Sequence, residues 1–196
     1  MNKLKFWASI VLGVGLLCPG QSASALPGQT IEEVAAWIQA HPTLQPASGE
    51  TLLVRKSDTP ARRFVFEALT VSPGRAEPDR SGLIRMEQML FFDRINGVSR
   101  SRLENSLQVI YDADVFEDYQ RARVVYRYPT PEHFNAAQNR RSPLLESLQG
   151  EVRRGERFAY WLEIAQIEAD TAYSGQITVF LIEDIEKLVL ELQSRE

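Results

Sequence analysis

Cysteine is almost absent from this sequence: Cys18 is the only one among 196 residues, and it lies in an apolar segment near the start of the chain. A disulfide bond within the chain is therefore excluded, because two cysteines are needed to form one. If the N-terminal segment is removed, thiol catalysis and cysteine-ligated metal sites are excluded as well. A chain of this length can bury enough apolar surface to fold without such cross-links.

Histidine and the common catalytic motifs are also scarce. The two histidines, His41 and His133, lie far apart, and neither has a second histidine or a cysteine at a spacing typical of metal ligands. The sequence contains no Gly-x-Ser-x-Gly motif, no glycine-rich phosphate loop and no His-Glu-x-x-His motif. We therefore assign no catalytic, cofactor-binding or metal-ligating residue, and we expect a protein that is not an enzyme.

The first 25 residues have the three parts of a secretory signal peptide. Lys3 and Lys5 give a positive start, residues 6–17 form an apolar run, and the sequence Ala-Ser-Ala at 23–25 gives the small-x-small pattern before a cleavage site. The apolar run is shorter than the roughly 20 residues of a membrane-spanning helix. We therefore predict a signal peptide over residues 1–25 and a single exported domain over residues 26–196. An uncleaved membrane anchor is the alternative.

Charge is unevenly distributed along the chain. Residues 119–157 carry eight arginines and four glutamates, whereas residues 158–196 carry two basic and eight acidic side chains. The whole chain has a formal net charge of -4. A protein that binds nucleic acid over a broad surface needs a basic face to match the phosphates. The acidic balance argues against that function, whereas the opposed charge zones favour docking to another molecule.

Hydrophobic periodicity divides the predicted domain into helices and strands. Thr30 and Glu33 have the spacing of a capping box, and Pro42 ends the segment that follows. A second cap pair is expected at Ser101 and Glu104. The expected helices cover residues 30–41, 101–111, 112–119, a short segment that opens at Thr130, 142–155 and 184–193. The expected strands cover residues 52–56, 63–71, 83–92, 121–128, 158–165 and 176–182, with a loop over 72–82 and a turn over 169–175.

This order of elements predicts an α+β fold. Strands arrive as hairpins, and helices are gathered between and after them. A parallel, doubly wound sheet would need regular alternation of strands and helices. We therefore expect a mostly antiparallel sheet packed by helices on one side, within a single domain.

Arginine is concentrated in one stretch of the chain. The seven candidate partner-binding residues are Arg121, Arg123, Arg127, Arg140, Arg141, Arg153 and Arg154. If these side chains converge, they form a cationic surface that can hold a carboxylate, a phosphate or an acidic protein. The alternative is an outward strand face whose arginines pair across the sheet with Glu67, Glu87 or Glu163.

Carboxylates and aromatic residues offer further candidate sites. Paired glutamates hydrolyse glycosidic bonds, so Glu87 and Glu163 would favour a hydrolase if they line one cleft. A second set of acids has the oxygen ligands of a hard-cation site, with a solvated helix face as the alternative; it comprises Asp112, Asp114, Glu117 and Asp118. Aromatic strand residues line a ligand groove or fill the core; they are Tyr126, Tyr128, Tyr160 and Trp161.

The C-terminal part of the chain carries a resemblance to known proteins. The runs that carry it are VVYRYP at 124–129, PLLESLQGE at 143–151, AYWLEIAQ at 159–166 and GQITVFL at 175–181. Over roughly its last 75 residues, the chain resembles a group of exported proteins of cyanobacteria that have no assigned activity. The resemblance implies the periplasm or the thylakoid lumen as the compartment, with the cell exterior as a further alternative.

These observations lead to one functional prediction with two alternatives. We predict a non-enzymatic accessory or binding protein, which docks through its arginine-rich surface to an acidic protein or a membrane-associated complex. We expect no nucleic-acid partner and no membrane-spanning segment after signal cleavage. The alternatives are an envelope hydrolase that uses strand carboxylates and a small-ligand carrier with a pocket lined by Tyr126, Tyr160 and Trp161.

Overall fold

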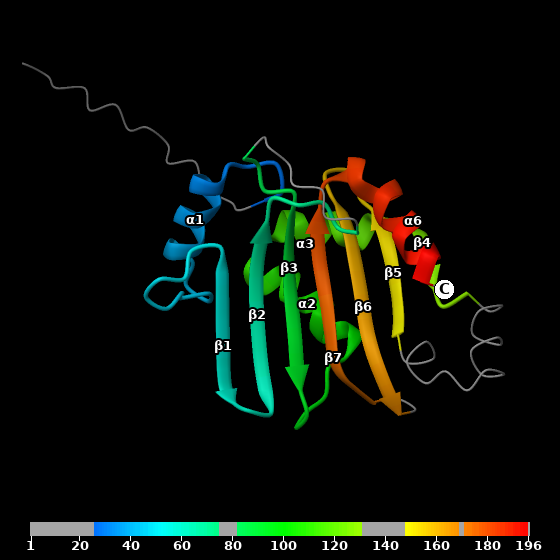
Figure 1. Ribbon diagram of the computed structural model, residues 1–196, viewed down its shortest axis with the longest axis horizontal. Helices are drawn as coiled ribbons and strands as arrows, with labels where there is room; N and C mark the ends of the chain where they lie inside the picture. The colour runs from blue at the N-terminus through cyan, green and yellow to red at the C-terminus, as the bar shows by residue number, and fades with distance from the viewer. Residues whose placement is uncertain (1–25, 75–81, 131–147, 169–170, 196) are drawn as a thin grey trace, which may run out of the picture.

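Seven antiparallel strands form one continuous sheet (Figure 1). The computed structural model describes residues 26–74, 82–130, 148–168 and 171–195. The strands are β1 (Leu53–Thr59), β2 (Arg62–Leu69), β3 (Met86–Asp93), β4 (Arg123–Tyr128), β5 (Leu148–Arg154), β6 (Ala159–Glu168) and β7 (Thr171–Phe180). Their order across the sheet is β1-β2-β3-β7-β6-β5-β4. The predicted α+β class with an antiparallel sheet is therefore confirmed.

The sheet consists of two meanders that meet at its centre. One contains β1, β2 and β3, and the other contains β4, β5, β6 and β7. β3 and β7 join them, with Leu90 opposite Gln176 in the register. The two edge strands are β1, the first strand of the first meander, and β4, the first strand of the second meander (Figure 1).

The helices are α1 (Ile31–Ala40), α2 (Arg100–Ile110), α3 (Ala113–Arg121), the short 3-10 helix η1 (Ile182–Asp184) and α6 (Ile185–Arg195). The predicted capping box of α1 is confirmed, because the Thr30 side chain accepts from the Glu33 backbone and the Glu33 side chain accepts from the Thr30 backbone. The predicted cap of α2 is wrong. Ser99, rather than Ser101, accepts the backbone N–H of Arg102 at 3.2 Å.

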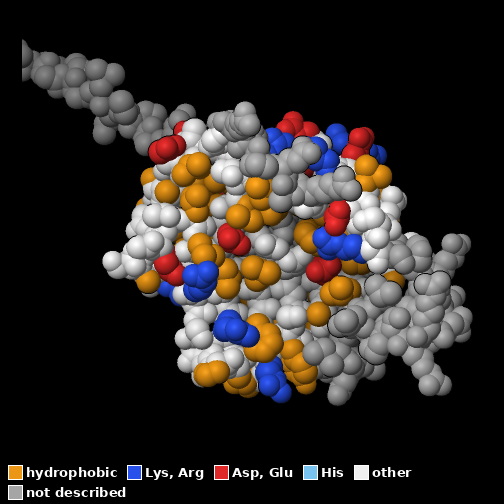
Figure 2. Space-filling view, in the orientation of Figure 1, with side chains coloured by type: hydrophobic (Ala, Val, Ile, Leu, Met, Phe, Trp, Pro, Cys, Tyr) orange, Lys and Arg blue, Asp and Glu red, His pale blue; other side chains and the backbone are white. Residues whose placement is uncertain are grey.

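Helices cover the two faces of the sheet unequally. The larger buried cluster lies under α1, α2 and α3, where Val34 and Leu107 pack with Phe66 and Ile177. A smaller cluster lies on the opposite face, where Leu188 of α6 packs with Trp161. Full burial of such an apolar side chain contributes about 1.5 to 3 kcal/mol. No described helix covers β1, β2 and β3 on the face that carries α6, and Figure 2 shows hydrophobic side chains there interspersed with charged ones.

Two segments differ from the predicted elements. The helix predicted over 142–155 is wrong from Leu148 onward, because residues 148–154 form β5. Gly150 lies so close to the Tyr128 ring that a Cβ has no room there, and tertiary packing of this kind overrides helical spacing. The turn predicted over 169–175 is also wrong in part, since β7 already begins at Thr171. The segment predicted to open a helix at Thr130-Pro131 and the start of the second helix at 142 fall largely outside the described residues.

Candidate functional site

The predicted arginines lie around the edge formed by β4 and β5, but they do not form one surface. Arg140 and Arg141 lie outside the described residues. Arg121 is on α3 and pairs with Glu117 at 3.4 Å, with both side chains well exposed. Arg127 and Arg153 are on the sheet face covered by α2 and α3, whereas Arg123 and Arg154 are opposite each other in the register of the two strands. Of the seven predicted arginines, the structure therefore brings together Arg127 with Arg153 and Arg123 with Arg154.

Glu151 is the centre of the first group, the Glu151 cluster (Arg100, Arg127, Arg153 and Glu151). Its carboxylate is 1% exposed, yet it receives three guanidinium groups. Arg153 Nε lies 2.5 Å from Oε1, Arg127 lies 3.1 Å from Oε2, and Arg100 contacts Oε1 as well. Burial alone would raise the pKa of the Glu151 carboxyl, but hydrogen bonds from Arg153 and Arg100 hold that pKa below its ordinary value.

The Glu151 cluster keeps an excess of positive charge. Among the described residues, one further carboxylate reaches it, that of Glu104, which accepts from Arg100 Nε at 3.1 Å. The guanidinium of Arg153 lies over the Tyr119 ring, 4.7 Å from its centre. Arg127 remains 67% exposed while it is held by the buried carboxylate. Its position is fixed by the fold, and its remaining N–H groups face solvent, which is the arrangement that holds an external anion.

The second group, the edge hollow, lies on the other face of the same edge. Arg123, Arg154 and Arg157 line an open hollow of about 720 Å³, and Glu183 and Glu186 line it as well. Within the described part of the chain, neither Arg123 nor Arg154 makes an ion pair. Both side chains are exposed. Arg157 lies 3.8 Å from the exposed Asp114 carboxylate, and its guanidinium lies over the Phe158 ring, 5.3 Å from the ring centre.

β4 runs between these two groups as an edge strand. It pairs with β5 on one side, and no described strand pairs with its other side. Val124 and Val125 are 41% and 39% exposed there, although valine is usually buried in a sheet. An edge strand with exposed apolar side chains is suited to receive an added strand.

The predicted carboxylate pair does not form. Glu87 lies on the face covered by α1–α3, whereas Glu163 lies on the opposite face, so the two cannot line one cleft. Glu67 shares the face of Glu163, but β3 and β7 lie between their strands, which separates the backbones by about 14 Å. Glycosidases need carboxyl groups about 5 to 9.5 Å apart. The alternative pairing of these glutamates with the predicted arginines is also wrong, since the cluster around Glu151 takes that role.

Glu87 and Glu163 instead serve as hydrogen-bond acceptors within the fold. The Tyr111 hydroxyl donates to Glu87 at 2.6 Å, and burial raises the pKa of that carboxyl to about 7. Glu163 accepts from the Tyr128 hydroxyl at 2.5 Å and from the Gln176 amide at 3.3 Å.

The acidic residues around α3 do not converge on a cation site. Asp112, Asp114 and Glu117 are exposed at different positions of the helix, and Asp118 is buried. Asp118 accepts the backbone N–H groups of Glu156, Arg157 and Phe158 and the Tyr160 hydroxyl. Within the described ranges, no group of acidic, histidine or cysteine side chains is arranged to hold a metal ion.

The predicted aromatic pocket is absent as well. Tyr160 is completely buried on the face under α3, whereas Trp161 lies on the opposite face under α6. Tyr126 stacks on Tyr128, with the ring centres 6.0 Å apart, and both pack against the α6 cluster. These side chains fill the two cores, so a pocket lined jointly by Tyr126, Tyr160 and Trp161 cannot form.

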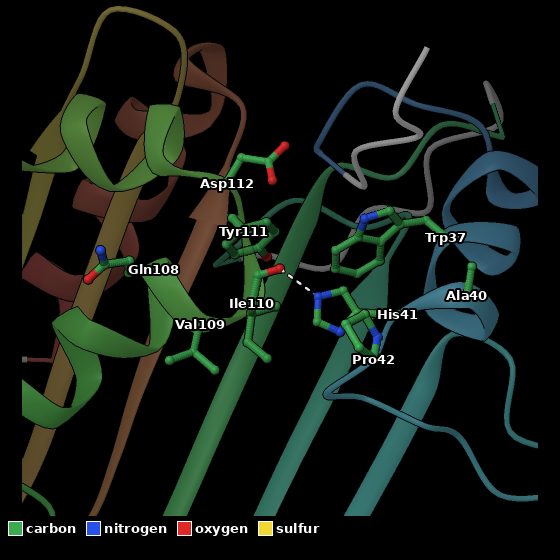
Figure 3. Close-up of a pocket in the computed structure, with 9 residues that line it drawn as sticks. All are labelled: Trp37, Ala40, His41, Pro42, Gln108, Val109, Ile110, Tyr111 and Asp112. Atoms are coloured by element: carbon green, nitrogen blue, oxygen red, sulfur yellow. Dashed lines mark hydrogen bonds between the residues drawn. The ribbon is translucent and has the colours of Figure 1, made fainter. Parts of the chain in front are cut away.

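One pocket was not predicted from the sequence. It lies between the C-terminal ends of α1 and α2 and has a volume of about 450 Å³ (Figure 3). We call it the α1–α2 groove; its lining residues are Trp37, Ala40, His41, Pro42, Gln108, Val109, Ile110, Tyr111 and Asp112. Figure 3 shows His41 reaching across from the α1 side to the Ile110 carbonyl, a distance of 2.9 Å. Two segments that are distant in the sequence form this groove, so periodicity alone carries no signal for it.

His41 is held in its neutral form in the α1–α2 groove. Its Nδ1 accepts the backbone N–H groups of Thr43 and Leu44, both at 3.2 Å, so the proton lies on Nε2 and is donated to Ile110. Burial lowers the pKa of His41, although the Ile110 carbonyl and the Asp112 carboxylate act in the opposite direction. The histidine therefore adds no positive charge to the groove near neutral pH.

Comparisons with known proteins give no further indication of function. No protein-family model, no curated protein and no solved structure matches the chain. No described helix combines the length and the apolar character of a membrane span.

Proposed function

We propose that this protein is a non-enzymatic binding module that receives an extended, acidic segment of a partner protein along β4. The observation that carries the proposal is the Glu151 cluster, in which one buried carboxylate holds three arginines at the sheet edge. A fixed excess of positive charge beside an edge strand attracts acidic chains and lowers the entropic cost of holding them.

The backbone of β4 supports an extended ligand rather than a compact one. Among the described strands, none pairs with its outer side, and an extended chain binds to such an edge by adding a strand to the sheet. The exposed Val124 and Val125 offer apolar contact to alternate side chains of that strand. Arg123 and Arg127, at either end of the same strand, offer ion pairs to its acidic residues.

The same geometry favours binding over hydrolysis. Glu87 and Glu163 lie on opposite faces of the sheet, and no histidine is among the described residues that line the edge hollow. The arginine-lined surfaces are open hollows rather than enclosed pockets with convergent acids and bases. We further propose that the protein acts outside the cytoplasm as an accessory or docking component; the support for this is the signal-like sequence of the first 25 residues.

The test measures binding of a defined peptide to the full-length protein. A labelled peptide of alternating Glu and Thr is titrated by fluorescence anisotropy, beside a Lys and Thr peptide of equal length. We expect the acidic peptide alone to bind, with affinity that falls as salt rises. The double reversal Arg123→Glu/Arg154→Glu changes two arginines that make no ion pair in the described structure. It is expected to weaken binding about tenfold or more.

A matched control variant distinguishes binding at the β4 edge from a general effect of the net charge of the protein. Arg55→Glu/Arg94→Glu makes the same change in net charge at two exposed positions of the opposite half of the sheet. This control is expected to alter affinity by no more than about twofold. Amide chemical shifts should change most along β4 when the acidic peptide binds. Equal losses in both double variants, or shifts spread over the whole surface, would reject docking at β4.

A further inference from the structure

The α1–α2 groove lies where the C-terminal ends of two helices meet. α1 ends at Ala40 and α2 ends at Ile110, and residues from the last turns of both line the groove. The C-terminal end of a helix carries roughly half a negative charge, because its last carbonyl groups have no partner within the helix. Neither helix has a basic side chain in its last turn. The two negative ends are therefore not neutralised by their own helices.

A carboxylate adds to this negative potential. Asp112 lines the α1–α2 groove and is exposed, and as the N-cap residue of α3 it makes no side-chain capping bond. It lies near enough to His41 to influence the charge state of that ring. No lysine or arginine is among the described residues that line the groove. The described lining of the groove is thus electronegative.

Aromatic and apolar side chains complete the walls. Trp37 is partly exposed, and its ring stacks on Tyr111 with the centres 6.1 Å apart and an angle of 14° between the planes. The His41 ring lies 4.5 Å from the Trp37 ring and is tilted by 51° to it, and these ring contacts hold the indole in place. Val109 is 58% exposed at the rim. In Figure 3, Trp37 and Asp112 border the same opening from opposite sides. An aromatic face beside a carboxylate is the combination that recognises ammonium groups.

We propose that the α1–α2 groove binds a small organic ammonium ion. The positive group lies between the Asp112 carboxylate and the indole face of Trp37, and its alkyl part contacts Val109 and Pro42. The volume of about 450 Å³ accommodates a side chain or a small metabolite rather than a folded domain. This site lies on α1 and α2, away from the β4 edge, so it does not depend on the function proposed above.

The experiment titrates the full-length protein with propylammonium and with tetramethylammonium, and it follows the Trp37 indole N–H by two-dimensional NMR. Propanol and propionate serve as neutral and anionic probes of similar size. We expect saturable shifts of the Trp37 and Asp112 signals with one or both ammonium ions and none with propionate. The two ammonium arms distinguish a primary amine, which donates hydrogen bonds to Asp112, from a quaternary group, which relies on the indole face.

Substitutions then test the assigned residues. Asp112→Asn is expected to weaken ammonium binding about fivefold or more, whereas Asp114→Asn, two positions along the chain and also exposed, leaves it unchanged. Val109→Lys, at an exposed rim position, supplies a tethered ammonium group and is expected to abolish binding without disturbing the fold. Equal shifts with propanol would show that the groove binds apolar groups whatever their charge, and this would overturn the proposal. Equal effects of the two asparagine variants, or no saturable shift at all, would overturn the proposal.

Discussion

The Tyr111 hydroxyl donates a hydrogen bond of 2.6 Å to Oε2 of Glu87, a carboxyl group that is completely buried between the sheet and the helices. Within the part of the chain that the structure describes, its other oxygen, Oε1, has no hydrogen-bond partner. Such a group is costly to ionise, because no positive charge replaces the lost water. The fold therefore holds a carboxyl that titrates near neutral pH, with its pKa raised to about 7 mainly by burial.

Replacement of this carboxyl by an amide should remove a pH dependence of stability. The folded pKa of Glu87 is raised from 4.5 to about 7, so its contribution is fully present below pH 4.5 and is lost as the pH rises through 7. The loss amounts to about 3 kcal/mol. We expect Glu87→Gln to be more stable than the parent by about 1 to 2 kcal/mol above pH 7, and not below pH 5, in urea unfolding. Glu67→Gln, on the uncovered face of β2, is the control; an identical change in both variants would contradict the prediction.

His41 should act on stability in the opposite direction. Its pKa is lowered in the folded state mainly by burial, so its contribution is present above the ordinary value of 6.5 and is lost as the pH falls below that value. We expect His41→Ala to lose about 2 kcal/mol, because Thr43, Leu44 and Ile110 each lose a hydrogen-bond partner. His41→Asn retains an acceptor for the two backbone N–H groups and should recover part of this loss.

The His41 effect is best measured in a background that lacks the Glu87 titration. With Glu87→Gln present, acidification below pH 6.5 should destabilise the parent histidine protein but not the His41→Asn protein. Ring nitrogen shifts in NMR should identify the Nε2–H tautomer. A ring protonated on Nδ1 at neutral pH would refute the assignment.

Local sequence rules predicted the elements whose structure depends on local interactions. The capping box at Thr30 and Glu33 and the alternation in β2 and β3 identified α1 and the first hairpin. They failed at 148–154, because Leu148 and Val152 fit both a helical spacing of four and a strand spacing of two. Gly150 decides between the two structures, because it has no Cβ and therefore leaves room for the Tyr128 ring. That contact depends on pairing between β4 and β5 and is invisible in the segment itself.

The candidate sites were predictable only in part, for the same reason. The concentration of arginine at 121–154 indicated where positive charge lies. It did not indicate that Glu151 organises it, or that Arg100 joins from a helix that precedes the segment. Which glutamate a given arginine meets depends on strand register and on the sheet face, and a shift of one residue exchanges the faces. The α1–α2 groove depends on a contact between His41 and Ile110, which long-range packing alone creates.

The buried carboxylate of Glu151 should matter far more than an exposed partner of arginine. Glu151→Gln leaves Arg153, which is 20% exposed, and two further arginines without their anion, and we expect a loss of about 2 to 3 kcal/mol. Glu117→Gln breaks the pair with Arg121, in which both side chains are more than half exposed, and should cost no more than about 0.5 kcal/mol. The folded pKa of Glu151 is lowered, so its contribution is present above pH 4.5 and is lost as the pH falls. Urea unfolding at neutral pH compares the variants, and equal losses would count against the Glu151 cluster.

Asp118 and Gly155 should behave as one unit that shapes the connection between β5 and β6. Asp118 Oδ1 accepts the Glu156 N–H at 2.8 Å, and Oδ2 accepts the Tyr160 hydroxyl at 2.7 Å. A Cβ at Gly155 would collide with this carboxylate. We expect Asp118→Ala to lose about 3 kcal/mol, because buried donors are left without an acceptor, and Gly155→Ala to lose about 1 to 3 kcal/mol through the collision. In the double variant the collision is gone, so the combined loss should be about 1 kcal/mol or more below the sum of the single losses. Strict additivity in urea unfolding would show that the glycine is required for a reason other than the Asp118 carboxylate.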